Sequence, residues 1–332
     1  MKKVLALLLT LVCLLAGSAA CSNSGNGTGG GDAAGEDYTV QMTASAALCG
    51  APIFIAMEMG YLEEFGVKYN YFNSETSQWD LMAAGRADMA YGLLPTFIQR
   101  IANGFELNVV MGAHYGCINI VATEESGIRD VSDLAGRTVG IPGSMGSDPA
   151  IMLQRTLVAH DIKISDVNMS VFNNADLATA LQEGFIEAFI SWDPYATLVS
   201  QQEGNLLIFN QAEHEATADE FCCLFGLRPA FLEEHPDMAR RFIGAMAKAC
   251  EFIAENPEEA ARISYEKGYI ADADYEFNGQ LLDSYRYEGK FSAAKESFVR
   301  VAEDLINLGI ISDNITSRQM ADKVFINIGE ID

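Results

Sequence analysis

Short apolar segments alternate with helix-like segments along most of this chain, and that alternation limits the folds it can adopt. The segments that read as strands are 39–45, 67–73, 88–94, 107–113, 118–123, 137–143, 168–173, 187–192 and 205–210. The clearest helix-like segments between them are 79–84, 148–159 and 177–183. Strands that alternate with helices usually form parallel sheets with helices on both faces. We therefore predict an α/β fold with parallel-rich sheets and flanking helices.

The last third of the chain has a different, helical pattern. From residue 236 to about residue 308, apolar residues recur at helical spacing, as at Phe242, Met246, Ala249 and Ile253. We interpret this stripe as core packing and predict a helical C-terminal region.

One unit of sequence occurs twice. Residues 85–95 and 184–194 share a glycine, an acidic residue three positions later and a proline ten positions later. Each follows a helix-like segment and contains a strand, and Gly85 and Gly184 fit the left-handed residue that ends a helix. The repeat indicates two similar α/β lobes, and a cleft between lobes is a natural container for a small ligand.

The first 20 residues read as a signal peptide. Two lysines precede an apolar segment, 4–16, that is too short to span a bilayer comfortably, and small residues then lead to Cys21. This pattern is similar to the lipobox of bacterial lipoproteins, in which the cysteine is diacylated. Ser18 stands where a large aliphatic residue is usual, so ordinary signal-peptidase cleavage nearby stays the alternative. The Gly- and Ser-rich sequence that follows predicts a flexible tether, so that 21–37 are lipidated cysteine and tether.

Charge and motifs argue against two classes of function. The chain has 46 acidic and 21 basic residues, a formal net charge of −25, and this charge repels nucleic acid and anionic lipid. No Ser/His/Asp or paired-carboxylate arrangement stands out, so we predict no catalytic residue. We accordingly expect a protein that is neither a nucleic-acid binder nor an enzyme.

Five motifs follow one another along the chain. They are APIFIAMEMGYLEEFGV at 51–67, LMAAGRADMAYG at 81–92, SGIRDVSDLAGRTVGIPG at 126–143, EAFISWDPY at 187–195 and ENPEEAARI at 255–263. In this order they resemble the nitrate/sulfonate/taurine and thiamine-pyrimidine group of ABC-transporter solute-binding proteins. The resemblance implies a two-lobed fold of the periplasmic-binding-protein type II, joined by two crossing strands. Lobe 1 would comprise 38–116 plus 224–332, and lobe 2 would comprise 117–223.

The resemblance also implies how such a chain works. The lobes would close on a small solute, and the closed form would be presented to the permease and ATPase subunits of an importer. We expect a monomer without a cofactor, held by lipid on Cys21 at the cell surface, on the extracytoplasmic face of the cell membrane.

Ligands of parallel α/β sheets bind beyond the carboxyl ends of the strands. This rule selects five loops, 45–50, 92–96, 114–117, 144–148 and 192–195. The candidate ligand-binding residues in them are Ser45, Leu48, Cys49, Gly92, Leu93, His114, Tyr115, Ser144, Met145, Ser147, Trp192 and Asp193. Asp148 is the expected N-cap of the next helix, and amides of 143–147 would either hold an anion or simply begin that helix.

None of the five loops contains a lysine or an arginine. A bare anion such as nitrate would meet no cation there, so a neutral, zwitterionic or cationic solute fits better. Trp192 offers a ring face and Asp193 an acceptor for an amino or ring N–H group. A thiamine-related pyrimidine or a taurine-like sulfonate uses both, and nitrate ranks behind them. For Trp192 core packing, and for Asp193 a turn before Pro194, stay the alternatives.

Five cysteines follow Cys21, and their spacing matches no zinc pattern, so no metal site is predicted. Cys117 and Cys222 both fall where the crossing strands should begin, so a disulfide between them, a vicinal pair at Cys222–Cys223 and free thiols all stay open. FCCLF at 221–225 loosely resembles the cysteine-rich iron segment of fungal thiamine-pyrimidine synthases. Those enzymes also need pyridoxal phosphate on a lysine, where this chain has Met59. The lysine is thus missing, which weighs against an enzyme. Because of the cysteine segment, an iron- and pyridoxal-phosphate-dependent enzyme stays the alternative function.

Overall fold

The computed structural model describes residues 38–44, 47–72, 76–270 and 273–329. The predicted signal peptide, Cys21, the tether and Ser45 lie outside the described residues. Within the described part, no helix has the length and apolar character needed to cross a membrane. Strands and helices alternate up to residue 227, which confirms the α/β prediction.

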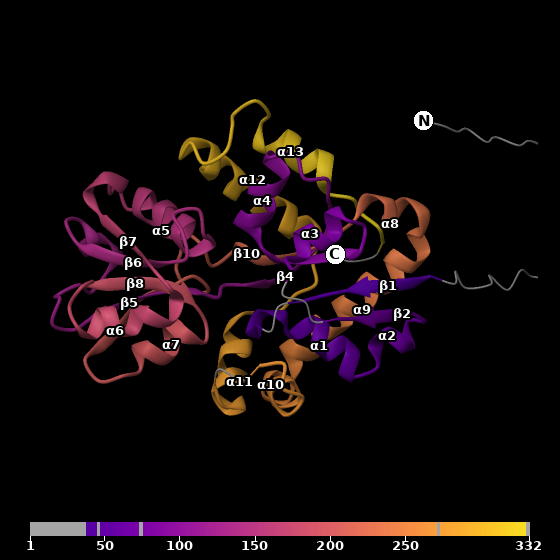
Figure 1. Ribbon diagram of the computed structural model, residues 1–332, viewed down its shortest axis with the longest axis horizontal. Coiled ribbons are helices and arrows are strands. Elements are labelled where there is room, and N and C mark those ends of the chain that lie inside the picture. Colours follow the sequence, from indigo (N-terminus) through magenta and orange to yellow (C-terminus); the bar gives the residue numbers. More distant parts are fainter. Residues whose placement is uncertain (1–37, 45–46, 73–75, 271–272, 330–332) are drawn as a thin grey trace, which may run out of the picture. The chain divides into compact units, whose positions relative to one another are not determined.

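Five strands form the largest sheet, in the order β7-β6-β8-β5-β9. Their bounds are β5 Ile118–Thr123, β6 Thr138–Pro142, β7 Asn168–Phe172, β8 Ala188–Trp192 and β9 Asn205–Asn210. β6 is parallel to β7 and β8, whereas β5 is antiparallel to β8 and β9. In Figure 1, α5 (Asp148–Ala159) lies on one side of this sheet and α6 (Leu177–Gln182) and α7 (Tyr195–Ser200) on the other.

Two smaller sheets contain the other strands. β1 (Thr39–Met42) is parallel to β2 (Lys68–Tyr71), and β10 (Phe221–Leu227) lies between β3 (Met89–Leu93) and β4 (Asn108–Tyr115), antiparallel to both. The nine strand segments read from the sequence correspond to β1–β9. β10 is not among them, because all seven of its residues are buried and its sequence shows no apolar–polar alternation.

The chain passes between the three-stranded and the five-stranded sheet twice. Gly116 and Cys117 join β4 to β5, and residues 211–220 join β9 to β10. Gly116 has φ +62°, and a Cβ there would lie 2.4 Å from the Cβ of Ala212, so the two crossings touch at a position that only glycine fits. This double connection between two α/β parts agrees with the predicted two-lobed fold.

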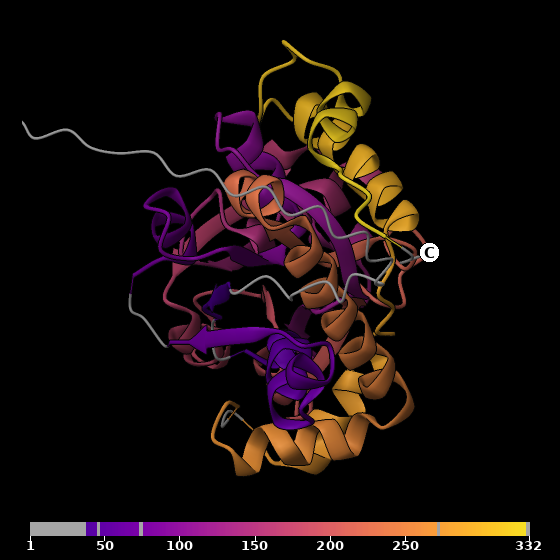
Figure 2. The ribbon, with the colours of Figure 1, turned by 90° about the vertical axis from the view of Figure 1, so that its right-hand side faces the viewer.

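Helices dominate the C-terminal third, as predicted, and Figure 2 shows them in orange and yellow along one side of the ribbon. They are α8 Pro229–Glu234, α9 Pro236–Glu255, α10 Pro257–Glu266, α11 Tyr275–Ser284, α12 Ser292–Asn307 and α13 Ser317–Val324. Phe242, Met246, Ala249 and Ile253 of α9 are fully buried, which confirms the packing stripe. Burying each large apolar side chain contributes roughly 1.5–3 kcal/mol.

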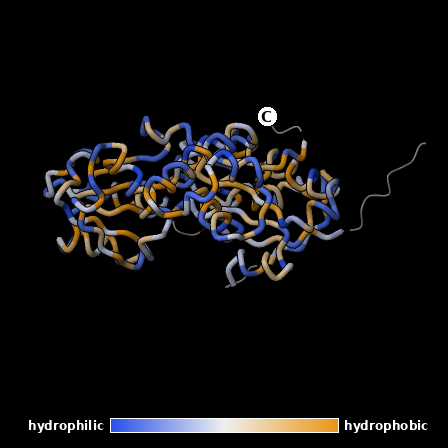
Figure 3. The backbone as a smooth tube through the Cα atoms, turned by 90° about the horizontal axis from the view of Figure 1, so that it is seen from above, coloured by the Kyte–Doolittle hydropathy of each residue, from blue (hydrophilic) through white to orange (hydrophobic). Residues whose placement is uncertain are grey.

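Three short 3-10 helices lie between strands of the five-stranded sheet: η2 Val131–Leu134, η3 Ile164–Asp166 and η4 Asn174–Asp176. The remaining helices all precede residue 103. They are the 3-10 helix η1 Leu48–Gly50, α1 Ala51–Glu58, α2 Tyr61–Glu64, α3 Gln78–Ala83 and α4 Leu94–Ala102. Gly85 after α3 and Gly184 after α6 have φ of 68° and 73°, so both glycines of the repeated unit adopt the predicted left-handed conformation. Figure 3 shows the apolar segments threading the interior of the sheets, with polar segments on peripheral loops and helices.

Candidate functional site

The strand register brings the predicted ligand loops together. Leu93 at the end of β3 and His114 near the end of β4 pair with Cys223 of β10 from its two sides. In the other sheet β6 and β8 are parallel neighbours, so the loops after Pro142 and after Trp192 lie at one edge.

A hydrogen-bonded contact joins these two edges. The Thr96 amide and hydroxyl, at the start of α4, donate to the Asp148 carboxylate at 2.8–2.9 Å. The predicted N-cap is therefore wrong. Ser147 occupies that position and Asp148 is the first helical residue, because its carboxylate is engaged by Thr96 instead. Burial raises the pKa of Asp148 to about 6, and the hydrogen bonds from Thr96 oppose this shift.

Three amides of the loop before α5 are engaged within the loop itself. The amides of Ser144, Gly146 and Ser147 donate to Pro142 O, Ser144 Oγ and Ser144 O respectively. Ser144 is exposed, and Met145 keeps 47% of its side-chain surface exposed. Of the two interpretations of residues 143–147, an ordinary helix start matches this geometry. Met145 lies at the protein surface.

Asp193 has partners of its own within the fold. Thr197 donates to its Oδ1 through the amide at 3.1 Å and the hydroxyl at 2.6 Å, and Asn119 Nδ2 donates to Oδ2 at 2.7 Å. Burial raises the pKa of Asp193, while these hydrogen bonds lower it. The carboxylate thus positions the start of α7 next to Trp192.

Two polar atoms on adjacent loops lack a partner among the described residues. They are Ser147 Oγ and Trp192 Nε1, and both atoms are buried. The indole N–H can only donate, and the hydroxyl can donate or accept. Buried polar groups without a partner are rare in folded proteins, so two at one sheet edge indicate a place where a ligand supplies the missing acceptors.

The loops after β1 and β4 are held by tyrosines that the sequence did not single out. Tyr91 and Tyr287 donate from their hydroxyls to the carbonyl oxygen of Cys49, at 2.5 Å and 3.3 Å, and thereby fix η1. Leu48 beside it is buried. The His114 ring stacks on Tyr285, which follows α11 directly, with ring centroids 5.3 Å apart.

Tyr115 lies on the opposite face of β4 from His114, as strand alternation requires. Its ring packs on Phe221 at 4.2 Å, and the Arg286 guanidinium lies 4.4 Å from its centroid. Tyr115 therefore packs in the apolar core that includes Phe97, Leu224 and Phe298, and it does not lie with His114. Gly92 lies beside Gln78 and Phe97, and a Cβ there would make ordinary van der Waals contacts with them at 3.6 and 3.9 Å.

The cysteines gather around His114. The Sγ atoms of Cys117 and Cys222 are 3.1 Å apart as free thiols, which matches the open alternative of unpaired cysteines. Burial raises the pKa of the Cys222 thiol, but hydrogen bonds from Cys117 and Cys223 outweigh this and lower it to about 6. Cys49 and Cys223 lie close to the His114 ring. Cys223 was not predicted as a site residue; its place opposite His114 depends on the β4–β10 register.

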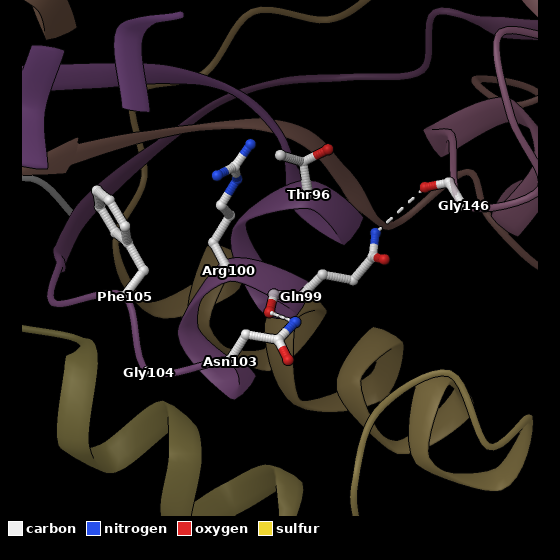
Figure 4. Close-up of a pocket in the computed structure, with 7 residues that line it drawn as sticks. All are labelled: Thr96, Gln99, Arg100, Asn103, Gly104, Phe105 and Gly146. Carbon is white, nitrogen blue, oxygen red and sulfur yellow. Dashed lines mark hydrogen bonds between the residues drawn. The ribbon is translucent and has the colours of Figure 1, made fainter. Parts of the chain in front are cut away.

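A pocket of about 530 Å³ opens beside these loops and includes a cation (Figure 4). Its lining residues are Thr96, Gln99, Arg100, Asn103, Gly104, Phe105 and Gly146. Gln99 Nε2 donates to Gly146 O at 3.5 Å, so the pocket lies where α4 meets the loop before α5. Arg100 lies one helical turn after Thr96, in α4 and outside the five predicted loops, so the sequence prediction did not include this cation.

Comparison with known proteins places this chain in a family. The family model described as "NMT1/THI5 like" matches residues 50–260, well over half of the chain. The chain belongs to the NMT1/THI5-like family. This family resemblance was predicted from the motifs, and it is confirmed.

Several known proteins are similar to this chain over most of their length. A putative aliphatic sulfonates-binding protein of Bacillus subtilis is 27% identical over 269 residues, covering 79% of this chain and 77% of that protein. A formylaminopyrimidine-binding protein of Halalkalibacterium halodurans is 24% identical, covering 64% of each. The crystal structure of the periplasmic aliphatic sulphonate binding protein SsuA from Escherichia coli superposes with a TM-score of 0.71 at 16% identity, covering 85% of this chain and 91% of that one. The shared fold confirms the predicted periplasmic-binding-protein architecture.

Proposed function

We propose that this protein is the extracytoplasmic solute-binding subunit of an ABC importer. It captures a small nitrogen- or sulfur-containing organic solute between lobe 1, residues 38–116 plus 224–332, and lobe 2, residues 117–223. The observation that carries the proposal is the pair of unpartnered buried donors, Ser147 Oγ and Trp192 Nε1, on neighbouring loops at one sheet edge. Lobe closure and delivery to permease and ATPase subunits follow from this role.

The chemistry of the site favours a taurine-like sulfonate. Sulfonate oxygens accept hydrogen bonds, which suits the Ser147 and Trp192 donors, and Arg100 in the adjoining pocket supplies a positive charge. The similarity to sulfonate-binding proteins supports the same choice. A thiamine-related pyrimidine is the second candidate, because ring nitrogens also accept from Trp192 and its indole offers a stacking face.

A thermal-shift screen of the purified chain tests the proposal. Taurine, alkanesulfonates, hydroxymethyl- and formylamino-pyrimidines and nitrate are each added to the protein. A solute at a hundred times its dissociation constant stabilises the folded state by roughly 2.7 kcal/mol. If no sulfonate or pyrimidine raises the melting temperature, the proposed solute class is wrong.

The two tryptophans supply a matched pair of variants. Trp192→Phe keeps an aromatic ring and removes only the N–H donor, so solute binding should weaken at least tenfold, in line with about 1.5 kcal/mol for one hydrogen bond to a charged group. Trp79→Phe changes a buried ring that packs on Phe97 and Phe105 and lies 5.3 Å from the Arg100 guanidinium; because phenylalanine keeps an aromatic face for Arg100, it should lose much less binding than Trp192→Phe. Equal binding by both variants would remove Trp192 from the site.

We also propose that lipid on Cys21 keeps this subunit at the membrane where its permease lies. Incorporation of labelled palmitate into the expressed chain measures the modification. Cys21→Ala should abolish labelling, whereas Cys13→Ala, inside the signal peptide, should leave it unchanged. A labelled Cys21→Ala protein would show that the anchor is elsewhere.

A further inference from the structure

Three side chains distant in sequence meet at the base of the two crossings. The Sγ atoms of Cys49 and Cys223 and a ring nitrogen of His114 all lie within 4.8 Å of one another. Cys49 belongs to η1, whereas His114 and Cys223 are cross-strand partners in β4 and β10. His114 and Cys223 have no exposed surface. The fold thus concentrates donor atoms in a place shielded from water.

One nitrogen of the His114 ring has a hydrogen-bond partner, and the other has none among the described residues. Nδ1 lies 3.2 Å from the carbonyl oxygen of Tyr115, which can only accept, so Nδ1 carries the proton. Nε2 then bears a lone pair, and this buried atom has no hydrogen-bond partner within the described ranges. Metal-binding histidines are held in this manner, with the non-ligating N–H donated to a carbonyl or carboxylate.

Two more thiols adjoin this group. Cys117 and Cys222, one from each crossing, have Sγ atoms 3.1 Å apart. The hydrogen bond with Cys222 raises the pKa of the Cys117 thiol, and those with Cys223 and Cys49 lower it, so Cys117 adjoins all three thiols. Its Sγ is not one of the three donor atoms that lie within 4.8 Å of one another. Two thiolates on one tetrahedral zinc ion lie roughly 3.8 Å apart, given Zn–S bonds of about 2.3 Å. The closer Cys117–Cys222 pair therefore contributes one ligand rather than two.

We propose that Cys49, His114, Cys117 and Cys223 form a binding site for one zinc ion. Three thiolates and a neutral imidazole are a common tetrahedral ligand set for Zn²⁺. The set contains no carboxylate or carbonyl oxygen, so it disfavours Ca²⁺ and Mg²⁺. This site goes beyond the proposed solute function, because it uses none of the Ser147, Trp192 or Arg100 groups assigned to the solute.

An ion held by these residues would join η1 to both crossings. Cys117 lies in the first crossing and Cys223 at the start of β10, just after the second. The ligands are spread over 49, 114, 117 and 223, which explains why no zinc spacing is visible in the sequence.

Cobalt substitution tests the site directly. The full chain is reduced, stripped with a chelator and titrated with Co²⁺ alone, whose tetrahedral thiolate complexes absorb strongly in the visible range. One equivalent should develop the bands, and Zn²⁺ should then bleach them. Cys223→Ser and His114→Gln each remove a ligand, so each should weaken binding by more than the roughly 100-fold that loss of an outer-shell partner causes.

Cys250→Ser is the matched control, since Cys250 is a buried free thiol in α9 outside the ligand set. It should keep the bands and the stoichiometry. Circular dichroism checks that each variant folds. If Cys223→Ser does not fold, Co²⁺ binding by Cys49→Ser and His114→Gln tests the site instead. Absence of tetrahedral bands in the reduced protein, or unchanged Co²⁺ binding by two folded ligand variants, would overturn the proposal. Solute binding is measured on the metal-free chain, so its failure and that of the metal site are separate results.

Discussion

Replacing Asp148 with asparagine should change how the stability of this protein depends on pH. The Asp148 carboxylate is buried between the starts of α4 and α5, where it accepts hydrogen bonds from Thr96. Burial raises its pKa from 3.8 to about 6, against the opposing effect of the hydrogen bonds from Thr96. That difference corresponds to roughly 3 kcal/mol of interaction that favours the protonated form in the folded state.

The sign follows from proton binding. Because the folded-state pKa is raised, the contribution of Asp148 is fully present below the unfolded pKa near 4 and is lost as pH rises through about 6. Asparagine keeps an acceptor and a donor for Thr96 but carries no charge at any pH. The free energy of unfolding of Asp148→Asn, relative to the parent, should therefore increase by about 2 kcal/mol between roughly pH 4 and pH 7, because at pH 4 the unfolded carboxyl is still partly ionised.

Urea unfolding followed by circular dichroism measures this difference at the two pH values. Asp313→Asn is the control, because the Asp313 side chain is exposed to solvent. The control should differ from the parent equally at both pH values. A relative stability of Asp148→Asn that is the same at both pH values would refute the reasoning.

Two further predictions concern contacts across the fold. Arg155→Met removes the 2.9 Å partner of buried Glu220, which keeps the more distant Arg300 at 3.9 Å, so the free energy of unfolding should fall by roughly 3 kcal/mol. Arg318→Met breaks an exposed pair and should scarcely change it. Similar urea midpoints for the two variants would contradict this. Gly116→Ala should destabilise more than Gly127→Ala, because both have positive φ but only the first Cβ would meet another chain segment. Equal thermal midpoints would show that the two crossings do not touch.

Much of the fold was readable from local pattern. The helix predicted over 148–159 matches α5, and the strands predicted over 118–123 and 205–210 match β5 and β9. Each of these is set by apolar periodicity within a few residues. Gly85 and Gly184 ended their helices as predicted, since a left-handed C-terminal residue is a local requirement.

The site was only partly predictable from the sequence, because its side chains meet through contacts between distant segments. Asp148 looked like an N-cap because its sequence neighbours, Ser147 and Pro149, are those of a helix start, but Thr96 of another helix engages it. Arg100 lies outside the five loops and reaches the pocket only because α4 packs against the loop containing Gly146. Side chains that act together here come from segments that only tertiary contacts bring near.

The sequence by itself determined nine of the strands, the repeated α/β unit, the helical C-terminal region and the family, because these depend on short-range periodicity and on motifs in order. Tertiary structure alone decided that β10 lies between β3 and β4, and hence that Cys223 faces His114 with Cys49 beside them. Strand register is fixed by the packing of whole faces against the core, and no local pattern encodes which distant partner a strand finds.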